Sequence, residues 1–386
     1  MSNVTISDAV RYIGCDDHQI DLFESQYPVP NGISYNSYVI LDEKIAVLDT
    51  ADRRVSEEWL AKLEAALEGR TPDYLIISHM EPDHAYNIQR LAEQYPTMQL
   101  VGNAKTFAML PLYFDFDFAR RKVVVKEGDT LPLGSHTLTF CMAPMVHWPE
   151  VMVEYESSEK LLFSADAFGK FGALDVDEPW DDEARRYYIN IVGKYGPSAQ
   201  GLLKKAAGLD IAAICPLHGP VLKENLAHYI GLYQTWSSYQ PEAAGVTLAY
   251  CSIHGNTADA ALALKAMLEE KGVTVAAFDL ARDSMSEAVA SAFRYDKLVL
   301  AAPTYDAALF PVMEDFLYHL KAKNYQKRTV AILENGSWAP MAGKLMRAYV
   351  EGFKGCTLVE PVVTIRGKLN GQSQAALAAL VDTLTA

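Results

Sequence analysis

Hydrophobic and polar positions follow two different patterns, separated by a small, polar, Pro- and Gly-bearing segment at residues 237–245. Before this segment, strand-like alternation and helical runs are interleaved, which predicts sheets flanked by helices over residues 1–240. The strands are expected at residues 33–42, 44–49, 123–125, 137–142 and 161–163, and the helices at residues 55–67 and 85–94.

The pattern after the boundary is stricter, because short apolar runs alternate regularly with amphipathic ones. Strands are predicted at residues 246–251, 273–280, 297–302, 329–333 and 356–363, and helices at residues 258–271, 285–294, 312–321, 341–353 and 373–385. Five strands that are each followed by a helix indicate a doubly wound five-stranded parallel sheet in residues 245–386. The expected fold class is therefore α/β, with two domains.

Composition excludes several classes of protein. The chain has 386 residues and a formal net charge of -15, which argues against nucleic acid or an anionic membrane as a partner. No apolar run approaches the roughly 20 residues that span a bilayer. Five scattered cysteines argue against a disulfide framework, so a reducing cytoplasm is the expected location.

Residues 78–84 are dense in potential metal ligands. His79, Glu81, Asp83 and His84 follow the apolar run at residues 74–77, so a strand would fix the loop that carries them. Carboxylate oxygens suit redox-active ions such as iron or manganese, while imidazole also suits zinc. This loop is the strongest sign of chemistry in the chain.

Three more potential ligands follow predicted strands: His147, Asp166 and His218, the last in a His-Gly-Pro turn. Four imidazoles and three carboxylates are more than one ion needs, so the set predicts two metals. A natural division gives each metal two imidazoles and one carboxylate and leaves one carboxylate to bridge. Asp166 suits bridging, because it lies between the other ligand strands in the sequence.

Three loops of the second part are expected at one sheet edge, where open parallel sheets bind ligands. The first opens a helix, lacks lysine and the Gly-x-Gly-x-x-Gly pattern, and suits a monophosphate such as that of FMN. The other two place Tyr305 and Trp338 where a flat ring can stack. The loops supply Ser252, Ile253, His254, Gly255, Asn256 and Thr257, then Pro303, Thr304, Tyr305, Asp306 and Ala308, then Asn335, Gly336, Ser337 and Trp338.

Together the seven ligands and the three loops resemble the flavodiiron protein family over essentially the whole chain. The resemblance implies a metallo-β-lactamase-like αββα sandwich in residues 1–240 and a flavodoxin-like domain in residues 245–386. It implies that His79, Glu81 and His147 bind one non-haem iron, that Asp83, His84 and His218 bind the other, and that Asp166 bridges them. It also implies that the three loops hold FMN. The sequence departs from some members at residues 23–27, which lack a histidine.

The resemblance implies reduction of dioxygen to water, of nitric oxide to nitrous oxide, or of both, with no catalytic residues beyond the metal ligands. Rubredoxin or a reduced deazaflavin coenzyme is the implied electron donor. The implied assembly is a head-to-tail homodimer, with a dimer of dimers as an alternative. Two rival interpretations are a dizinc hydrolase with a flavodoxin domain and a plain electron carrier.

Overall fold

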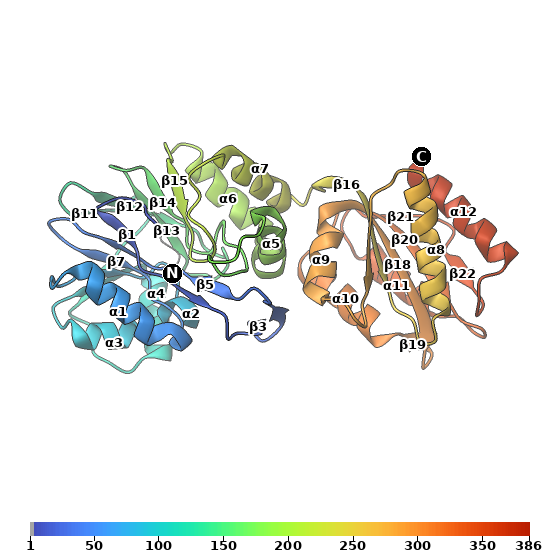
Figure 1. Cartoon of the computed structure of the whole chain (residues 1–386), viewed down its shortest axis with the longest axis horizontal. Coiled ribbons are helices and arrows are strands. Elements are labelled where there is room, and N and C mark those ends of the chain that lie inside the picture. The colour runs from blue at the N-terminus through green and yellow to red at the C-terminus, as the bar shows by residue number, and fades with distance from the viewer. Residues whose placement is uncertain (1–3) are drawn as a thin grey trace. The chain divides into compact units, whose positions relative to one another are not determined.

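The computed structural model describes residues 4–386 and divides into two compact units (Figure 1). One unit ends at Gln234 and the other runs from Thr235 to Ala386, so the division falls inside helix α7 (Leu226–Ser237). Within residues 4–386, no helix combines the length and the apolar character needed to cross a bilayer.

The first unit has two large sheets between layers of helices, which confirms the predicted αββα sandwich (Figure 1). One sheet has the order β1 (Val10–Tyr12), β6 (Tyr38–Ile40), β7 (Ala46–Leu48), β8 (Tyr74–Ile76), β9 (Gln99–Gly102) and β10 (Lys122–Val124). The other has the order β11 (Thr130–Pro132), β12 (Thr137–Met142), β13 (Met152–Glu156), β14 (Leu161–Phe163) and β15 (Ala213–Cys215). The helices are α1 (Ser56–Leu67), α2 (Pro82–Ala85), α3 (Ile88–Gln94), α4 (Ala104–Tyr113), α5 (Trp180–Tyr187) and α6 (Gly196–Ala206).

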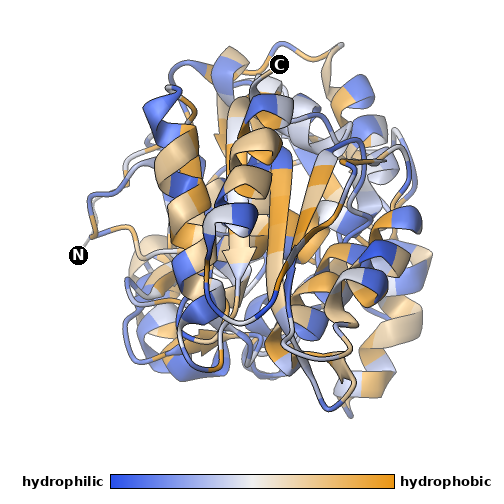
Figure 2. Cartoon of the chain, turned by 90° about the vertical axis from the view of Figure 1, so that its right-hand side faces the viewer, coloured by the Kyte–Doolittle hydropathy of each residue, from blue (hydrophilic) through white to orange (hydrophobic). Residues whose placement is uncertain are grey.

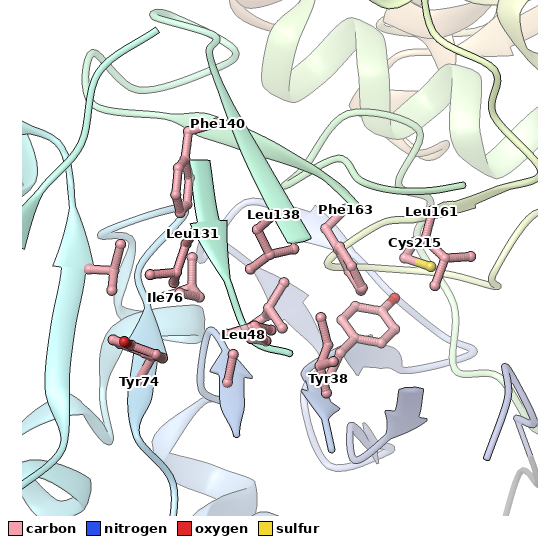
Figure 3. Packing of buried hydrophobic residues seen from close by; sticks show 14 of the residues in the cluster. Tyr38, Leu48, Tyr74, Ile76, Leu131, Leu138, Phe140, Leu161, Phe163 and Cys215 are labelled. Carbon is pink, nitrogen blue, oxygen red and sulfur yellow. The ribbon is translucent and has the colours of Figure 1, made fainter. Parts of the chain in front are cut away.

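The inner faces of the two sheets form one hydrophobic core (Figure 3). Leu48 and Ile76 of the first sheet and Leu138, Phe140 and Phe163 of the second belong to the same cluster, and each is at most 3% exposed. Burying apolar side chains on both sheets stabilises the sandwich, because each fully buried side chain contributes about 1.5–3 kcal/mol. The core thereby fixes the strand ends from which the ligand loops emerge.

The structure differs from the predicted pattern at residues 33–42, which form two strands instead of one. Strand β5 (Ile33–Tyr35) pairs with β2 (Cys15–Asp17), whereas β6 pairs with β1 and β7. Between β5 and β6, the backbone N–H of Asn36 donates to the Leu217 carbonyl at 2.8 Å. The break therefore arises because this part of the backbone binds a distant turn. The predicted helix at residues 85–94 is likewise divided, into α2 and α3.

The second unit has a parallel sheet that confirms the flavodoxin-like fold. Its strands lie in the order β17 (Val275–Asp279), β16 (Ala243–Tyr250), β18 (Tyr295–Tyr305), β20 (Thr329–Asn335) and β21 (Thr357–Leu358), while β22 (Val363–Ile365) also pairs with β20. Numbered along the chain, this is the order 2-1-3-4-5, which reverses direction between β16 and β18. The helices are α8 (Asn256–Glu270), α9 (Met285–Arg294), α10 (Pro311–Ala322), α11 (Ala342–Glu351) and α12 (Gly371–Thr385).

The central strands of this sheet are apolar and covered by helices, as the orange strands of Figure 2 show. The single strand predicted at residues 356–363 is instead two short strands, β21 and β22. Pro361 lies between them. Proline has no N–H to donate to the neighbouring strand, so it interrupts the ladder there.

Candidate metal centre and cofactor pocket

The structure gathers all seven predicted ligands into two adjoining groups. The first group contains His79, Glu81, His147 and Asp166, and the second contains Asp83, His84 and His218. Within each group, one potential ligand atom from every residue lies within 4.8 Å of all the others. The carboxyl ends of strands from both sheets position these residues, as the sequence pattern predicts.

In the first group, carboxylate oxygens lie between two imidazoles. Glu81 Oε2 is 3.1 Å from His79 Nε2 and 2.9 Å from His147 Nε2. Asp166 Oδ2 is 3.4 Å from the same nitrogen of His79 and 3.0 Å from that of His147. Atoms bound to one metal at about 2.0–2.2 Å lie roughly 2.9–3.6 Å apart, so these separations match the edges of a coordination site.

The second group has the same spacing. The Nε2 atoms of His84 and His218 are 3.0 Å apart, and Asp83 Oδ2 lies 3.4 and 3.3 Å from them. Asp166 Oδ1 is 3.5 Å from His84 Nε2, while Asp166 Oδ2 faces the first group. The two oxygens of Asp166 therefore face different groups, which is the arrangement of a bridging carboxylate.

Several buried polar atoms here have no hydrogen-bond partner among the described residues: both carboxylate oxygens of Asp83, both of Asp166, and Nε2 of His147. Unpaired buried polar atoms are costly and rare, so a concentration of them indicates an external partner. Burial opposes charge on His147, but the nearby carboxylates of Asp166 and Glu81 raise its pKa to about 9. The site thus favours positive charge, and its donors fit two metal ions.

The loop that carries four of the ligands is fixed at both ends. Oδ1 of the buried Asp49 accepts from the backbone N–H of Ser78 at 2.8 Å and of His79 at 3.3 Å. Pro82 is the first residue of α2, where its missing N–H costs nothing and its φ suits the helix. Thr50 Oγ1 donates at 2.7 Å to the backbone carbonyl of His84, the last candidate ligand of the loop.

Two ligand rings have partners on the side away from the metal positions. Nδ1 of His79 donates to Oε1 of Glu150 at 2.9 Å, and Nδ1 of His218 donates to the Ser34 carbonyl at 2.7 Å. Burial opposes ionisation of Glu150, but the hydrogen bond from His79 lowers its pKa. Sequence reasoning missed Glu150, although a carboxylate three residues after His147 was a visible signal.

Asn36, between β5 and β6, makes hydrogen bonds around the His218 turn. Its Nδ2 donates to the carbonyls of Pro216 at 2.8 Å and Gly219 at 2.7 Å, on either side of His218. Its Oδ1 accepts from the Tyr12 hydroxyl at 2.9 Å. The turn that holds His218 is therefore fixed by the segment between β5 and β6, far away in the sequence.

Aromatic rings pack around His218. Phe23 comes from the segment that lacks a histidine, and its ring lies edge-on to the His218 ring at 5.4 Å. The buried Tyr187 ring is 5.5 Å from His218, at the point where α5 passes into a π-helical turn, η2 (Tyr188–Val192). π-Helical turns often occur at functional sites. These rings give the second group an apolar wall.

The second unit contains a cavity of about 520 Å³ at the carboxyl ends of β16, β18 and β20. Predicted residues that line it are Ser252, Ile253, His254, Asn256, Thr257, Pro303, Thr304, Asp306, Asn335, Gly336, Ser337 and Trp338. The predicted residues Gly255, Tyr305 and Ala308 do not line it, whereas Ala307, Ala339 and Gly367 do. The cavity lies where the strand order reverses, which is the usual ligand site of such sheets.

Hydrogen bonds fix the second and third loops. Asn335 Nδ2 donates to the Gly367 carbonyl at 2.9 Å, and Asn335 Oδ1 accepts from the Gly367 N–H at 3.0 Å. Thr304 Oγ1 accepts from the Met341 N–H at 2.8 Å. Gly255 has φ +92°, which favours glycine, and immediately precedes α8.

The cavity fits a flavin with a phosphate group. Hydroxyls of Ser252 and Thr257 lie at the N-terminal end of α8, where backbone N–H groups and the helix dipole favour an anion. Trp338 is 81% exposed, which is unusual for so large an apolar ring and leaves its face available for stacking. No lysine or arginine lines the cavity among the described residues.

Comparisons with known proteins agree with both sites. Residues 33–219 match the model of the "ODP family beta lactamase". An uncharacterized protein of Methanocaldococcus jannaschii is 31% identical over 324 residues, which cover 82% of this chain and 81% of the relative. The nitric oxide reductase of Moorella thermoacetica is 28% identical over 382 residues, covering 96% of this chain and 94% of the relative.

Solved structures cover both units. The rubredoxin oxygen:oxidoreductase of Desulfovibrio gigas superposes with a TM-score of 0.92 and 25% identity, over 99% of this chain and 97% of that one. The flavodiiron protein of Giardia intestinalis shares the fold, with a TM-score of 0.94 over 100% of this chain and 96% of that one, at 22% identity. With the fold, the ligand groups and the relatives in agreement, this chain belongs to the flavodiiron protein family.

Proposed function

We propose that this protein is an oxidoreductase that reduces dioxygen to water, nitric oxide to nitrous oxide, or both. The observation that carries the proposal is the pair of matched ligand groups with Asp166 between them. Relatives named nitric oxide reductase and rubredoxin oxygen:oxidoreductase support it. The enzyme is proposed to use two non-haem irons and FMN.

In this proposal, His79, Glu81 and His147 hold one iron, Asp83, His84 and His218 hold the other, and Asp166 bridges them. Two adjacent irons held by these residues would offer a binding place for a small diatomic oxidant and would pass electrons to it. The protein keeps the imidazoles in the orientation that binds metal through the outer partners of His79 and His218. The aromatic wall beside His218 limits water at the site.

The second unit is proposed to bind FMN through its three loops, with the phosphate at Ser252–Thr257 and the ring between the loops of Thr304 and Asn335. A flavin supplies single electrons from a two-electron store. Rubredoxin or a reduced deazaflavin coenzyme is the proposed donor, and a head-to-tail homodimer, or a dimer of such dimers, is the proposed assembly. A reducing cytoplasm is the proposed setting, in keeping with the five free cysteines.

The test is anaerobic consumption of dioxygen and of nitric oxide, measured in parallel on photoreduced protein supplied with rubredoxin. Iron, zinc and flavin are counted in the same sample. Fast uptake of either gas with about two irons and one flavin per chain supports the proposal. Bound zinc without uptake would favour a hydrolase, and flavin without any metal would favour an electron carrier.

A paired substitution links the activity to the site. Asp166→Ala is expected to abolish gas uptake while flavin remains bound, because it removes the carboxylate that faces both ligand groups. Asp175→Ala is the matched control, since Asp175 is a half-exposed carboxylate that pairs with the half-exposed His18. Equal activity of the two variants would contradict the proposal.

A further inference from the structure

The two ligand groups are matched in the residues that face the metal positions. Each has two imidazoles and one carboxylate of its own, Glu81 in the first group and Asp83 in the second. Asp166 presents one oxygen to each group. A difference in metal affinity between the two positions must therefore come mainly from groups outside the ligands.

The outer partners of the imidazoles are not matched. Oε1 of the fully buried Glu150 accepts from Nδ1 of His79 at 2.9 Å and from the Met80 N–H at 2.8 Å. In the second group, Nδ1 of His218 meets only the neutral Ser34 carbonyl, at 2.7 Å. Nδ1 of His84 is buried and has no hydrogen-bond partner among the described residues.

This contrast has a direct electrostatic consequence. A carboxylate that accepts from one imidazole nitrogen makes the other nitrogen a stronger electron donor and fixes the ring for metal binding. It also places a further negative charge near the cation, in a buried region where water screens little. A carbonyl oxygen supplies a dipole in place of a charge, so it strengthens metal binding by the imidazole less than a carboxylate does.

Other nearby buried carboxylates lack such a contact with an outer ring nitrogen, although the charge of Asp49 also acts on His84 of the second group. Oδ1 of Asp49 binds backbone N–H groups of Ser78 and His79, so it does not polarise an imidazole through a ring nitrogen. Oε2 of Glu154 accepts from the Ser78 hydroxyl at 3.0 Å. Glu150 is thus the carboxylate that contacts the outer nitrogen of a ligand ring.

We propose that Glu150 is a positioning residue that makes the His79–Glu81–His147 position the tighter of the two metal positions. The Asp83–His84–His218 position then fills second and loses its metal first. This inference rests on the proposed function, because it assumes that both groups bind metal.

The test is a stepwise metal titration. Metal-stripped protein that retains its flavin is titrated anaerobically with Fe²⁺ against a competing chelator, and two dissociation constants are fitted. The unaltered protein is expected to show two separate steps. His218→Gln is expected to abolish the weaker step and keep the tighter one, which assigns each step to its position.

The decisive variant is Glu150→Gln, which keeps the shape and an acceptor oxygen but removes the charge. It is expected to weaken the tighter step by about 10–100-fold and to leave the weaker step unchanged. Glu150→Asp retains the charge and is expected to keep the two steps apart, which also covers the case in which Glu150→Gln fails to fold. Glu154→Gln is the matched control, an equally buried glutamate expected to change neither step.

The outcomes separate this inference from the proposed function. Equal weakening of both steps by Glu150→Gln, or no change in either, would overturn the role of Glu150. Two indistinguishable steps in the unaltered protein would overturn the asymmetry itself. Failure of the unaltered protein to bind any Fe²⁺ would overturn the proposed diiron function, and the inference with it.

Discussion

Replacing Asn36 with alanine is the sharpest test of how the fold supports the His218 side of the metal centre. The side chain of Asn36 is fully buried and makes three hydrogen bonds, to the carbonyls of Pro216 and Gly219 and from the Tyr12 hydroxyl. The Pro216 carbonyl keeps the Tyr38 hydroxyl as a second donor at 2.6 Å. The Gly219 carbonyl has no other donor among the described hydrogen bonds, so Asn36→Ala leaves this carbonyl without a hydrogen-bond partner.

The expected cost follows from these contacts. Three lost hydrogen bonds contribute about 1 kcal/mol each, and an orphaned buried carbonyl adds about 1–2 kcal/mol. Asn36→Ala is therefore expected to lower the free energy of unfolding of the first unit by about 4–5 kcal/mol. The His218 turn should also loosen, so iron content should fall while flavin content stays unchanged.

The assay combines differential scanning calorimetry with counts of iron and flavin. Asn31→Ala is the matched control, because Asn31 is exposed and its Nδ2 makes a single hydrogen bond, to Glu178 at 2.7 Å. That variant should lose less than about 1 kcal/mol. A loss below about 1 kcal/mol for Asn36→Ala, with full iron content, would refute the view that Asn36 holds the His218 turn.

Three further predictions concern features away from the metal ligands. Burial opposes charge on His136, but the hydrogen bond to Asp42 raises the pKa of His136. The stabilising effect of this pair should be full below about pH 6 and should decline as pH rises through the raised pKa. Denaturation of His136→Gln should therefore show a larger loss of stability at about pH 5.5 than at about pH 8.5, and an equal loss would contradict this. Gly255→Ala forces alanine into φ +92° at a cost of about 1–2 kcal/mol, so fluorescence titration should show flavin affinity about tenfold weaker. The control is Gly272→Ala, at φ +80° in an open turn, which should bind flavin normally. Trp338→Ala should weaken flavin binding by up to about tenfold through lost stacking, and unchanged affinity would show that the ring does not contact the flavin.

Local sequence signals predicted the α/β fold and placed the candidate metal ligands after strands, where the structure has them. Alternation of strands and helices in the second half was enough to predict its parallel sheet, because buried strands and amphipathic helices leave different periods in a sequence. Strand β14 occupies residues 161–163, as predicted. The errors at β5, β6, β21 and β22 arose where a distant contact or a proline interrupted an apolar run.

Only the tertiary structure decided how the site is supported. The candidate ligands could be identified from the sequence, since their residue types and positions after strands are local properties. It could not show that Asn36 binds Gly219, 183 residues away, or that Glu150 meets the outer nitrogen of His79. Such contacts depend on which strand ends the folded core brings together, and a single sequence does not record that proximity.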